Sequence, residues 1–286
     1  MIAKKGSSLI LEGGATRGIF TSGVLDYLME QDYYIPNVIG VSMGACNGTG
    51  YLSRQVGRTR NCIIQDGDGE NYLDIKNAIK NRSLFDMDLI FDKYPKEIYP
   101  FDFETFFASP LRLEMVVTNC LTGQAEYLGE MQDPERLMQI ARASSSMPMV
   151  CPVVMLEGQP YLDGGIADSI PILHSIKTGH KKNVLILTRQ KGYRKKPIQK
   201  SRPLYLAALK AYPNLYRALM NRARIYNKTL SYVEKWEKEG KVFVIRPTVK
   251  PVSRTETNKD NLTAFYQHGY DIMKAQFEAM KEFIGD

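Results

Sequence analysis

Residues 36–50 read Pro36-Asn-Val-Ile-Gly40-Val-Ser42-Met-Gly44-Ala-Cys-Asn-Gly-Thr-Gly50. The apolar run Val38-Ile-Gly-Val41 predicts a buried strand, and the small residues after Gly44 predict a helix that packs closely on a sheet. Between them, Gly40 to Gly44 match the pattern G-x-S-x-G, in which a strand turns sharply into a helix and presents the serine hydroxyl above the sheet. The segment therefore predicts an α/β protein with Ser42 as a candidate nucleophile at the end of a strand.

A second strand, turn and helix lie directly upstream. Leu9-Ile-Leu11 predicts a strand, and apolar residues at helical spacing predict a helix around residues 20–28. A strand, a helix and a strand in this order form a right-handed unit with parallel strands. The loop after Leu11, Gly13-Gly14-Ala15-Thr16-Arg17-Gly18, should therefore lie beside Ser42 at one edge of the sheet.

This glycine loop can bind an anion through its backbone N–H groups. One candidate is a nucleotide phosphate, but the spacing matches neither G-x-x-x-x-G-K-[ST] nor G-x-G-x-x-G. The other is the oxyanion of an acyl-transfer reaction at Ser42, which the predicted position of the loop favours. The positive end of the helix that follows Ser42 also suits a developing oxyanion. A non-catalytic or nucleotide-binding α/β protein remains the alternative.

Short apolar runs alternate with amphipathic stretches along most of the chain, as in a sheet with crossover helices. Further strands are predicted at 113–118, 124–128, 153–156, 184–187 and 242–245. Helices are predicted over 134–143, after the N-cap Asp133, and over 262–284. We expect a single domain over residues 1–286, with cap-forming excursions at 58–107 and 191–240, where the alternation is lost.

The composition is that of a folded globular protein. Of the 286 residues, 44% are hydrophobic and 24% are charged, which excludes a collagen-like, disordered or coiled-coil chain. No apolar run approaches the roughly 20 residues of a membrane-spanning helix, and no secretory signal pattern is present. The four cysteines have neither disulfide nor zinc spacing. We expect a cytoplasmic protein with free thiols and no metal.

The net charge of +7 originates in one segment. Residues 189–241 contain 15 basic and 3 acidic residues, against 23 basic and 28 acidic residues elsewhere. Within 204–220, apolar and aromatic side chains alternate with basic ones. This pattern fits a helix packed on the core with a solvated basic face, or a helix in peripheral contact with an anionic membrane surface. We expect no nucleic-acid partner, because no binding motif accompanies the charge. The pattern does not indicate an oligomeric state.

A serine nucleophile needs a base. None of the three histidines lies in a sequence setting typical of one; they are His174, His180 and His268. Asp163 is followed by Gly164 and Gly165, which would let its carboxylate turn toward a neighbouring strand end. In a partly dry site a carboxylate can hold a raised pKa and accept the serine proton. A Ser-His-Asp esterase and a plain Asp-Gly turn are the alternatives.

Three blocks, taken in order, resemble the patatin-like phospholipase family: Gly13 to Gly18, Gly40 to Gly44, and Asp163-Gly164-Gly165. Residues 143–152 are similar to the serine- and proline-containing stretch that precedes the aspartate in that family. The match spans about residues 8–190, and the sequence from Asp163 to Pro171 is similar to the bacterial cytoplasmic branch. The resemblance implies a three-layer α/β/α fold with a central, mostly parallel sheet and a cap of inserted helices.

The resemblance also implies the chemistry. A Ser42–Asp163 dyad without histidine would hydrolyse lipid or other acyl esters through an acyl-enzyme, as a phospholipase A or lysophospholipase without cofactor. The implied oxyanion hole consists of backbone N–H groups at Gly13, Gly14, Ala15 and Met43. The supporting residues are Arg17, Gly18, Gly40, Gly44, Gly164 and Gly165.

Three positions need separate expectations. The family usually has a third glycine where this chain has Ala15, and a methyl group there narrows the permitted dihedral angles. Arg17 is expected to clamp the loop or to contact an anionic head group. Asp168, the alternative acid, is expected to cap a helix ahead of Pro171.

Overall fold

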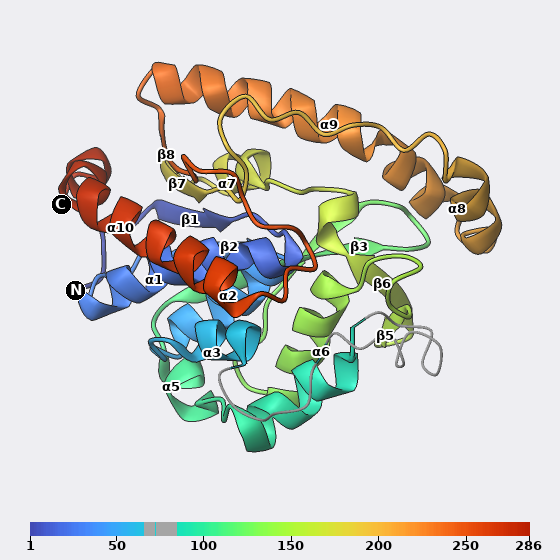
Figure 1. Cartoon of the computed structure of the whole chain (residues 1–286), viewed down its shortest axis with the longest axis horizontal. Coiled ribbons are helices and arrows are strands. Elements are labelled where there is room, and N and C mark those ends of the chain that lie inside the picture. The colour runs from blue at the N-terminus through green and yellow to red at the C-terminus, as the bar shows by residue number, and fades with distance from the viewer. Residues whose placement is uncertain (66–71, 73–84) are drawn as a thin grey trace.

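The structure is a computed structural model that describes residues 1–65, 72 and 85–286. Within these residues, eight strands form one sheet in the order β5-β6-β3-β2-β1-β7-β8, with β4 paired to β3 (Figure 1). The strands are β1 (Ser7–Leu11), β2 (Asn37–Val41), β3 (Arg112–Asn119), β4 (Ala125–Leu128), β5 (Val154–Leu156), β6 (Gln159–Asp163), β7 (Lys182–Ile186) and β8 (Val242–Ile245). The five strands β3, β2, β1, β7 and β8 are parallel to one another, whereas β4 and β6 run antiparallel to β3.

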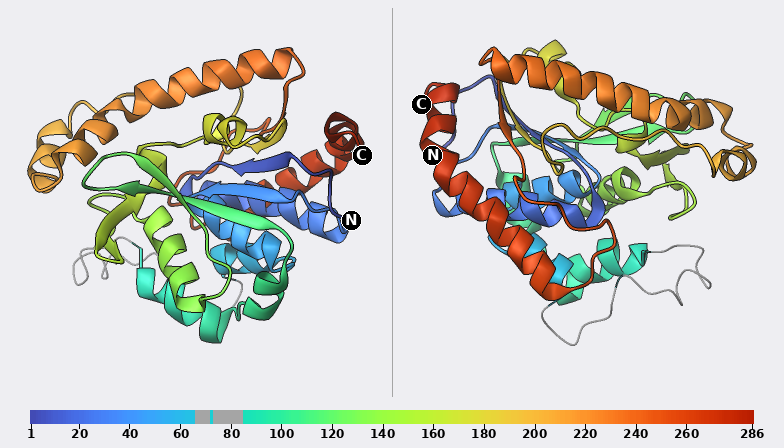
Figure 2. Two further views of the ribbon diagram at one scale, coloured as in Figure 1. Left: turned by 180° about the vertical axis from the view of Figure 1, so that it is seen from behind. Right: turned by 45° about the horizontal axis from the view of Figure 1, so that its top comes forward.

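Helices cover both faces of the sheet (Figures 1 and 2). Along β1, Leu9 and Leu11 pack into one core and Ile10 into another, as the alternation of side chains along a strand requires. The first core is closed by α1 (Ile19–Glu30), α2 (Met43–Leu52), α6 (Pro134–Ser145) and α10 (Lys259–Ile284), with α3 (Arg58–Ile64), the π-helix η2 (Leu89–Ile98) and α5 (Phe103–Ala108) outside them. The second is closed by α7 (Ile172–Lys177) and α9 (Pro213–Lys238). The expected three-layer α/β/α architecture is therefore confirmed.

Most of the predicted elements occur within a few residues of the expected bounds. Helix α6 begins after Asp133, whose side chain accepts hydrogen bonds from Glu135 N and Arg136 N and so acts as the expected N-cap. The sequence interpretation missed β6. Pro160 and the preceding Glu157-Gly158 turn favour a loop there, but β6 pairs with β3 on one side and β5 on the other.

Helix α9 has two packing environments. In its first half, Leu215 and Leu219 pack against Leu162 and Ile166 beside β6. In its second half, residues from Tyr226 to Val233 pack on β1, β7 and β8 and form an outer layer of the fold. The short helix α8 (Arg202–Ala208) has no buried residue and lies beyond the sheet. In the other expected excursion, 58–107, residues 66–71 and 73–84 lie outside the described residues.

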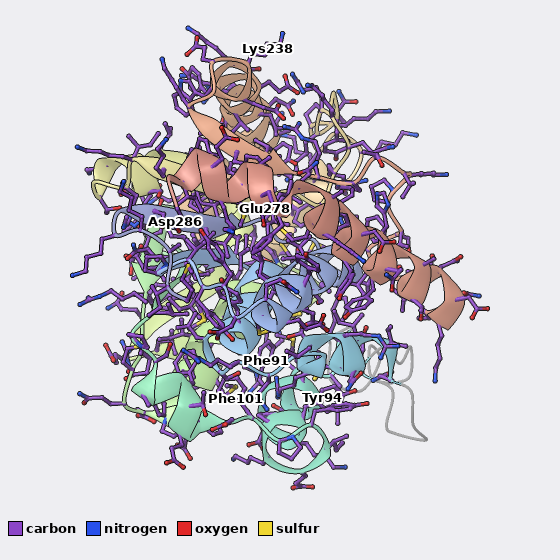
Figure 3. All side chains as sticks on the ribbon, turned by 90° about the vertical axis from the view of Figure 1, so that its left-hand side faces the viewer. Phe91, Tyr94, Phe101, Lys238, Glu278 and Asp286 are labelled. Atoms are coloured by element: carbon purple, nitrogen blue, oxygen red, sulfur yellow. The ribbon has the colours of Figure 1, made fainter. Side chains whose placement is uncertain are left out.

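Helix α10 joins the C-terminal region to the first core through a close backbone contact. A Cβ on Gly269 would lie 2.1 Å from Phe20 O, and one on Gly23 would lie 2.1 Å from Tyr266 O. Figure 3 shows Lys238 of α9 at the top of the molecule, Glu278 of α10 below it, and Phe91, Tyr94 and Phe101 in the lower part. Among the described residues, no helix is both long and apolar enough to cross a membrane.

Candidate active site

Ser42 lies in a sharp turn between β2 and α2. Its φ of 56° and ψ of −126° are unusual for a residue with a side chain, and backbone strain of this kind persists where neighbours hold it in place. The first turn of α2 is pressed against the end of β1, since a Cβ on Gly44 would lie 2.2 Å from Leu11 O. The predicted strand-to-helix elbow at Ser42 is therefore present.

The glycine loop contacts this elbow. A Cβ on Gly13 would lie 2.7 Å from Ser42 Cβ, so the loop can approach the serine only without a side chain at this position. Ala15 adopts a φ of 51°, in the left-handed region that favours glycine. No hydrogen bond in the described part of the chain uses the N–H of Gly14, Ala15 or Met43. These N–H groups are free to receive an acceptor.

Asp163 ends β6, beside β3, and is 2% exposed. Its N–H donates to Ser146 O at 2.7 Å, and its Oδ1 accepts a hydrogen bond from Gly165 N at 2.7 Å. Burial raises the pKa of the carboxyl group above its ordinary value, against the opposing effects of the Arg222 charge and a hydrogen bond from the Ser42 side chain. The fold thus brings Ser42 and Asp163 together, 121 positions apart in the sequence, and makes the carboxylate more basic than an exposed aspartate.

Ser144 supports the elbow, and the sequence interpretation did not assign it a role. Its hydroxyl donates to Val116 O at 2.7 Å and accepts a hydrogen bond from Ser42 N at 2.9 Å. It therefore links β3 to the strained residue. The only sequence signal was its place in the stretch 143–152, which the family resemblance had singled out.

We predict that Ser144→Ala lowers both stability and the activity that depends on Ser42. The change removes the acceptor of the part-buried Ser42 N–H and one donor to the buried Val116 carbonyl, and leaving a buried polar group unsatisfied costs about 1–3 kcal/mol. Thermal unfolding should show a lower Tm, and labelling of Ser42 by a fluorophosphonate should slow. Ser144→Thr, which keeps the hydroxyl, is the matched control. A wild-type labelling rate in a folded Ser144→Ala variant would show that this bond does not position Ser42.

The three histidines lie elsewhere. His174 stacks on Tyr127 and lies with Nε2 2.9 Å from Glu114 Oε2. His180 contacts the hydroxyls of its own turn, and His268 accepts a hydrogen bond from Thr248 N. None of the three lines the cavities that contain Ser42. A Ser-His-Asp arrangement has no histidine available at this site.

Asp168 does not have the expected role, and Arg17 has one of the two positions expected for it. Asp168 does not cap α7, which begins at Ile172; instead its carboxylate accepts a hydrogen bond from Tyr127 OH at 2.8 Å. Its side chain therefore contacts β4, which contains Tyr127, and Pro171 occupies the N-cap position of α7. The Arg17 guanidinium is 5% exposed and lies against Gly14, 3.2 Å from where a Cβ would be. This position fits a clamp on the glycine loop.

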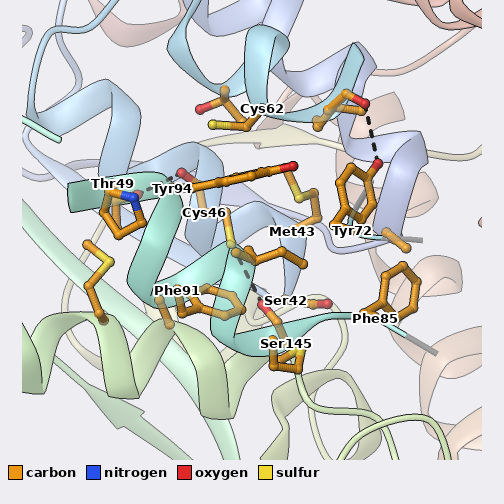
Figure 4. A pocket seen from close by; sticks show the side chains of 18 of the residues that line it. Ser42, Met43, Cys46, Thr49, Cys62, Tyr72, Phe85, Phe91, Tyr94 and Ser145 are labelled. Carbon is orange, nitrogen blue, oxygen red and sulfur yellow. Dashed lines mark hydrogen bonds between the residues drawn. The ribbon is translucent and has the colours of Figure 1, made fainter. Parts of the chain in front are cut away.

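Two cavities meet at Ser42. The first, of about 140 Å³, is mostly apolar, although Arg58 and several hydroxyl side chains also line it, and lies between α2, α3, α6 and η2 (Figure 4). Met43, Cys46, Phe91 and Tyr94 are among the residues that line this cavity. Cys46 Sγ lies 3.7 Å from Ser145 Oγ. Burial raises the pKa of Cys46 and that of Cys62, the latter to about 11, so both thiols act as apolar wall. The second cavity, of about 210 Å³, contains Asp163 and the glycine loop.

Comparison with known proteins identifies the family. A model of the patatin-like phospholipase family matches residues 9–176, and the chain belongs to this family. The resemblance noted in the sequence is confirmed. A second model, of a domain of unknown function (DUF6363), matches residues 212–285, which include α9, β8 and α10.

One curated protein and one solved structure are similar to this chain. The uncharacterized protein YjjU of Escherichia coli is 31% identical over 188 residues, which is 63% of this chain and 51% of that protein. The chain thus spans about half the length of this curated relative. The structure of VipD from Legionella pneumophila superposes with a TM-score of 0.51 at 13% identity and covers 96% of this chain and 67% of its own. At that identity the likeness supports the fold alone.

Proposed function

We propose that this protein is a serine acyl hydrolase of lipid esters, of the phospholipase A or lysophospholipase type, which uses Ser42 and Asp163 as a dyad. The observation that carries this proposal is that Ser42 lines the same cavity as Asp163, whose buried carboxyl group has a raised pKa that the Ser42 side chain partly offsets. The free N–H groups of the glycine loop beside Ser42 add to it.

The cycle needs two proton transfers to Asp163 and two from it. Asp163 takes the proton of Ser42, and Ser42 Oγ attacks the ester carbonyl carbon. The N–H groups of Gly14, Ala15 and Met43, with Gly13 allowing the close approach, stabilise the oxyanion. Asp163 then protonates the leaving alcohol. Water, deprotonated by Asp163, hydrolyses the acyl-enzyme and the proton returns to Ser42.

The apolar cavity is the acyl-chain site in this proposal. It contains Ser42 and Met43 at the start of α2, and most of its surface is apolar. Transfer of an acyl chain from water into such a cavity is favourable in proportion to the apolar area buried. An ester group at Ser42 therefore has its fatty acid on this side.

The segment 191–240 supplies the proposed contact with an anionic membrane surface. In α8, Leu204 and Leu206 are 56% and 55% exposed, and Tyr205 between them lines the cavity that contains Asp163. Arg202 is the first residue of this helix and Lys210 follows its end, so a basic side chain lies at each end. Exposed leucines beside cations match an interfacial segment, and we propose a cytoplasmic protein that reaches the membrane from this side.

Release of fatty acid from mixed vesicles of phosphatidylethanolamine and phosphatidylglycerol tests the function. We expect release by the wild-type chain. We also expect each of three variants to retain most of the activity, because no histidine takes part; they are His174→Gln, His180→Gln and His268→Gln. Absence of hydrolysis of any ester would support a non-catalytic protein, and loss of activity in one folded histidine variant would support a Ser-His-Asp esterase.

A further inference from the structure

The second cavity at Ser42, which we call the basic chamber, has an excess of cationic side chains. Five basic residues line it; they are Arg17, Arg189, Lys195, Arg222 and Arg254. Its acidic residues are Glu12 and Asp163. Three of the five come from the basic segment, residues 189–241, and Arg254 comes from the loop before α10.

None of the five forms an ion pair with a carboxylate of the described residues. Glu12 is already bonded to Thr188 N at 2.7 Å and to Tyr226 OH at 2.6 Å. Basic residues close to the chamber in sequence behave differently, since Arg194 pairs with Glu234 and Arg246 pairs with Glu237, each at 2.6 Å. Inside the chamber the partners are uncharged: Arg189 lies over the Tyr193 ring, Lys195 lies over the Tyr226 ring, and Arg222 donates to Gly165 O.

Burial disfavours the positive charge on three of these residues, Arg17, Lys195 and Arg222. Arg17 is 5% exposed, and its Nε atom is buried without a hydrogen-bond partner. Burial and the neighbouring Arg222 lower the pKa of Lys195 to about 6, and burial with Arg189 and Arg254 lowers that of Arg17 to about 10. Mutually repelling cations in a partly dry cavity are stabilised when an anion occupies it.

We propose that the basic chamber binds the phosphate of an anionic lipid head group, and that the protein therefore prefers lipid esters with a net negative head group to zwitterionic ones. This inference rests on the proposed function. Ala15, Ser42, Phe85 and Ser145 line both cavities, so a substrate whose ester lies at Ser42 has its acyl chain on the apolar side and its head group in the chamber.

The chemistry of the chamber suits this ligand. Guanidinium groups donate paired hydrogen bonds to phosphate oxygens, and such charge-assisted bonds are about twice as strong as neutral ones. Arg222 Nε donates to Gly165 O, which holds its guanidinium next to Asp163. A choline group would instead bring a further cation among these residues. Arg222 and Arg254 both lie in the region matched by the domain of unknown function, and this assigns that region a role as the cationic wall of the site.

Two lysolipids that differ only in the head group test the proposal in detergent, where binding to a membrane surface does not contribute. Lysophosphatidylglycerol and lysophosphatidylcholine with one acyl chain are dispersed in neutral detergent, and a p-nitrophenyl ester serves as the head-group-free substrate. We expect the wild type to favour the anionic lipid in kcat/KM. Arg254→Gln should lower kcat/KM for that lipid about tenfold, as expected for one charge-assisted bond, with little change for the p-nitrophenyl ester. Arg254→Lys should recover part of the loss.

Arg194→Gln is the control, because it removes one positive charge from the same segment outside the chamber. Equal kcat/KM for the two lysolipids, or equal loss on all three substrates in Arg254→Gln, would overturn the proposal. A parallel arm measures protection against thermal unfolding by inorganic phosphate and by glycerol 3-phosphate. Protection in the wild type that is lost in Arg254→Gln supports the subsite even if no ester is hydrolysed, in which case the proposed function alone fails. No protection in the wild type would overturn the subsite.

Discussion

Ser42→Ala is expected to reduce ester hydrolysis by at least about 10⁴-fold, because the attacking oxygen is lost while the fold is kept. The substitution removes one atom from a half-buried side chain whose backbone is held by Ser144. Stability should therefore change little. Hydrolysis of a p-nitrophenyl ester, with the Tm measured on the same preparation, checks both parts of the expectation.

Ser231→Ala is the matched control for this variant. Ser231 is an exposed residue of α9 whose hydroxyl bonds to Asn227 O within the helix. Its replacement should leave the rate unchanged. If Ser42→Ala retains a substantial share of the wild-type rate, another residue carries the reaction and the assignment of the nucleophile is wrong.

Asp163→Asn is expected to reduce kcat/KM by about 10³–10⁴-fold, since an amide has nearly the same shape but cannot accept the serine proton. The wild-type pH profile follows from the raised pKa of Asp163. Only the ionised carboxylate is a base, so activity should fall as the pH drops through this pKa. The acid limb should lie above the ordinary aspartate value of 3.8, which a pH series of kcat/KM measures.

Asp168→Asn separates the two candidate acids. Its carboxylate bonds to Tyr127 and does not line either cavity at Ser42. We expect a loss of less than about tenfold, of the kind that follows from modest destabilisation. A larger loss in Asp168→Asn than in Asp163→Asn, with both variants folded, would reverse the assignment.

The parts of the site that the sequence predicts are those built by neighbouring residues. The elbow at Ser42 and the glycine loop each follow a strand directly, and the parallel pairing of β1 with β2 places them together. Local spacing and the handedness of the connection were sufficient to predict this pair. Asp163 was predicted from the resemblance and from the glycines after it, although β6, the strand that positions it, was not.

The head-group side of the site could not be predicted in the same way. Arg222 reaches Asp163 from the middle of α9, and Arg254 arrives from a loop that also contacts Thr16. No short-range pattern records such contacts, because they depend on how α9 crosses the sheet. The sequence did reveal an excess of positive charge over 189–241. It did not reveal that part of this charge faces inward, onto the cavity of Ser42.

The central claim is that Ser42 Oγ is made reactive by Asp163 and by the glycine loop. Peptide mass spectrometry after treatment of the wild type, Ser42→Ala and Asp163→Asn with a fluorophosphonate tests it most directly. We predict one adduct in the wild type, on the peptide that contains Ser42, no adduct in Ser42→Ala, and much slower labelling in Asp163→Asn. An adduct on a different residue, or equally fast labelling of the Asp163→Asn variant, would contradict it.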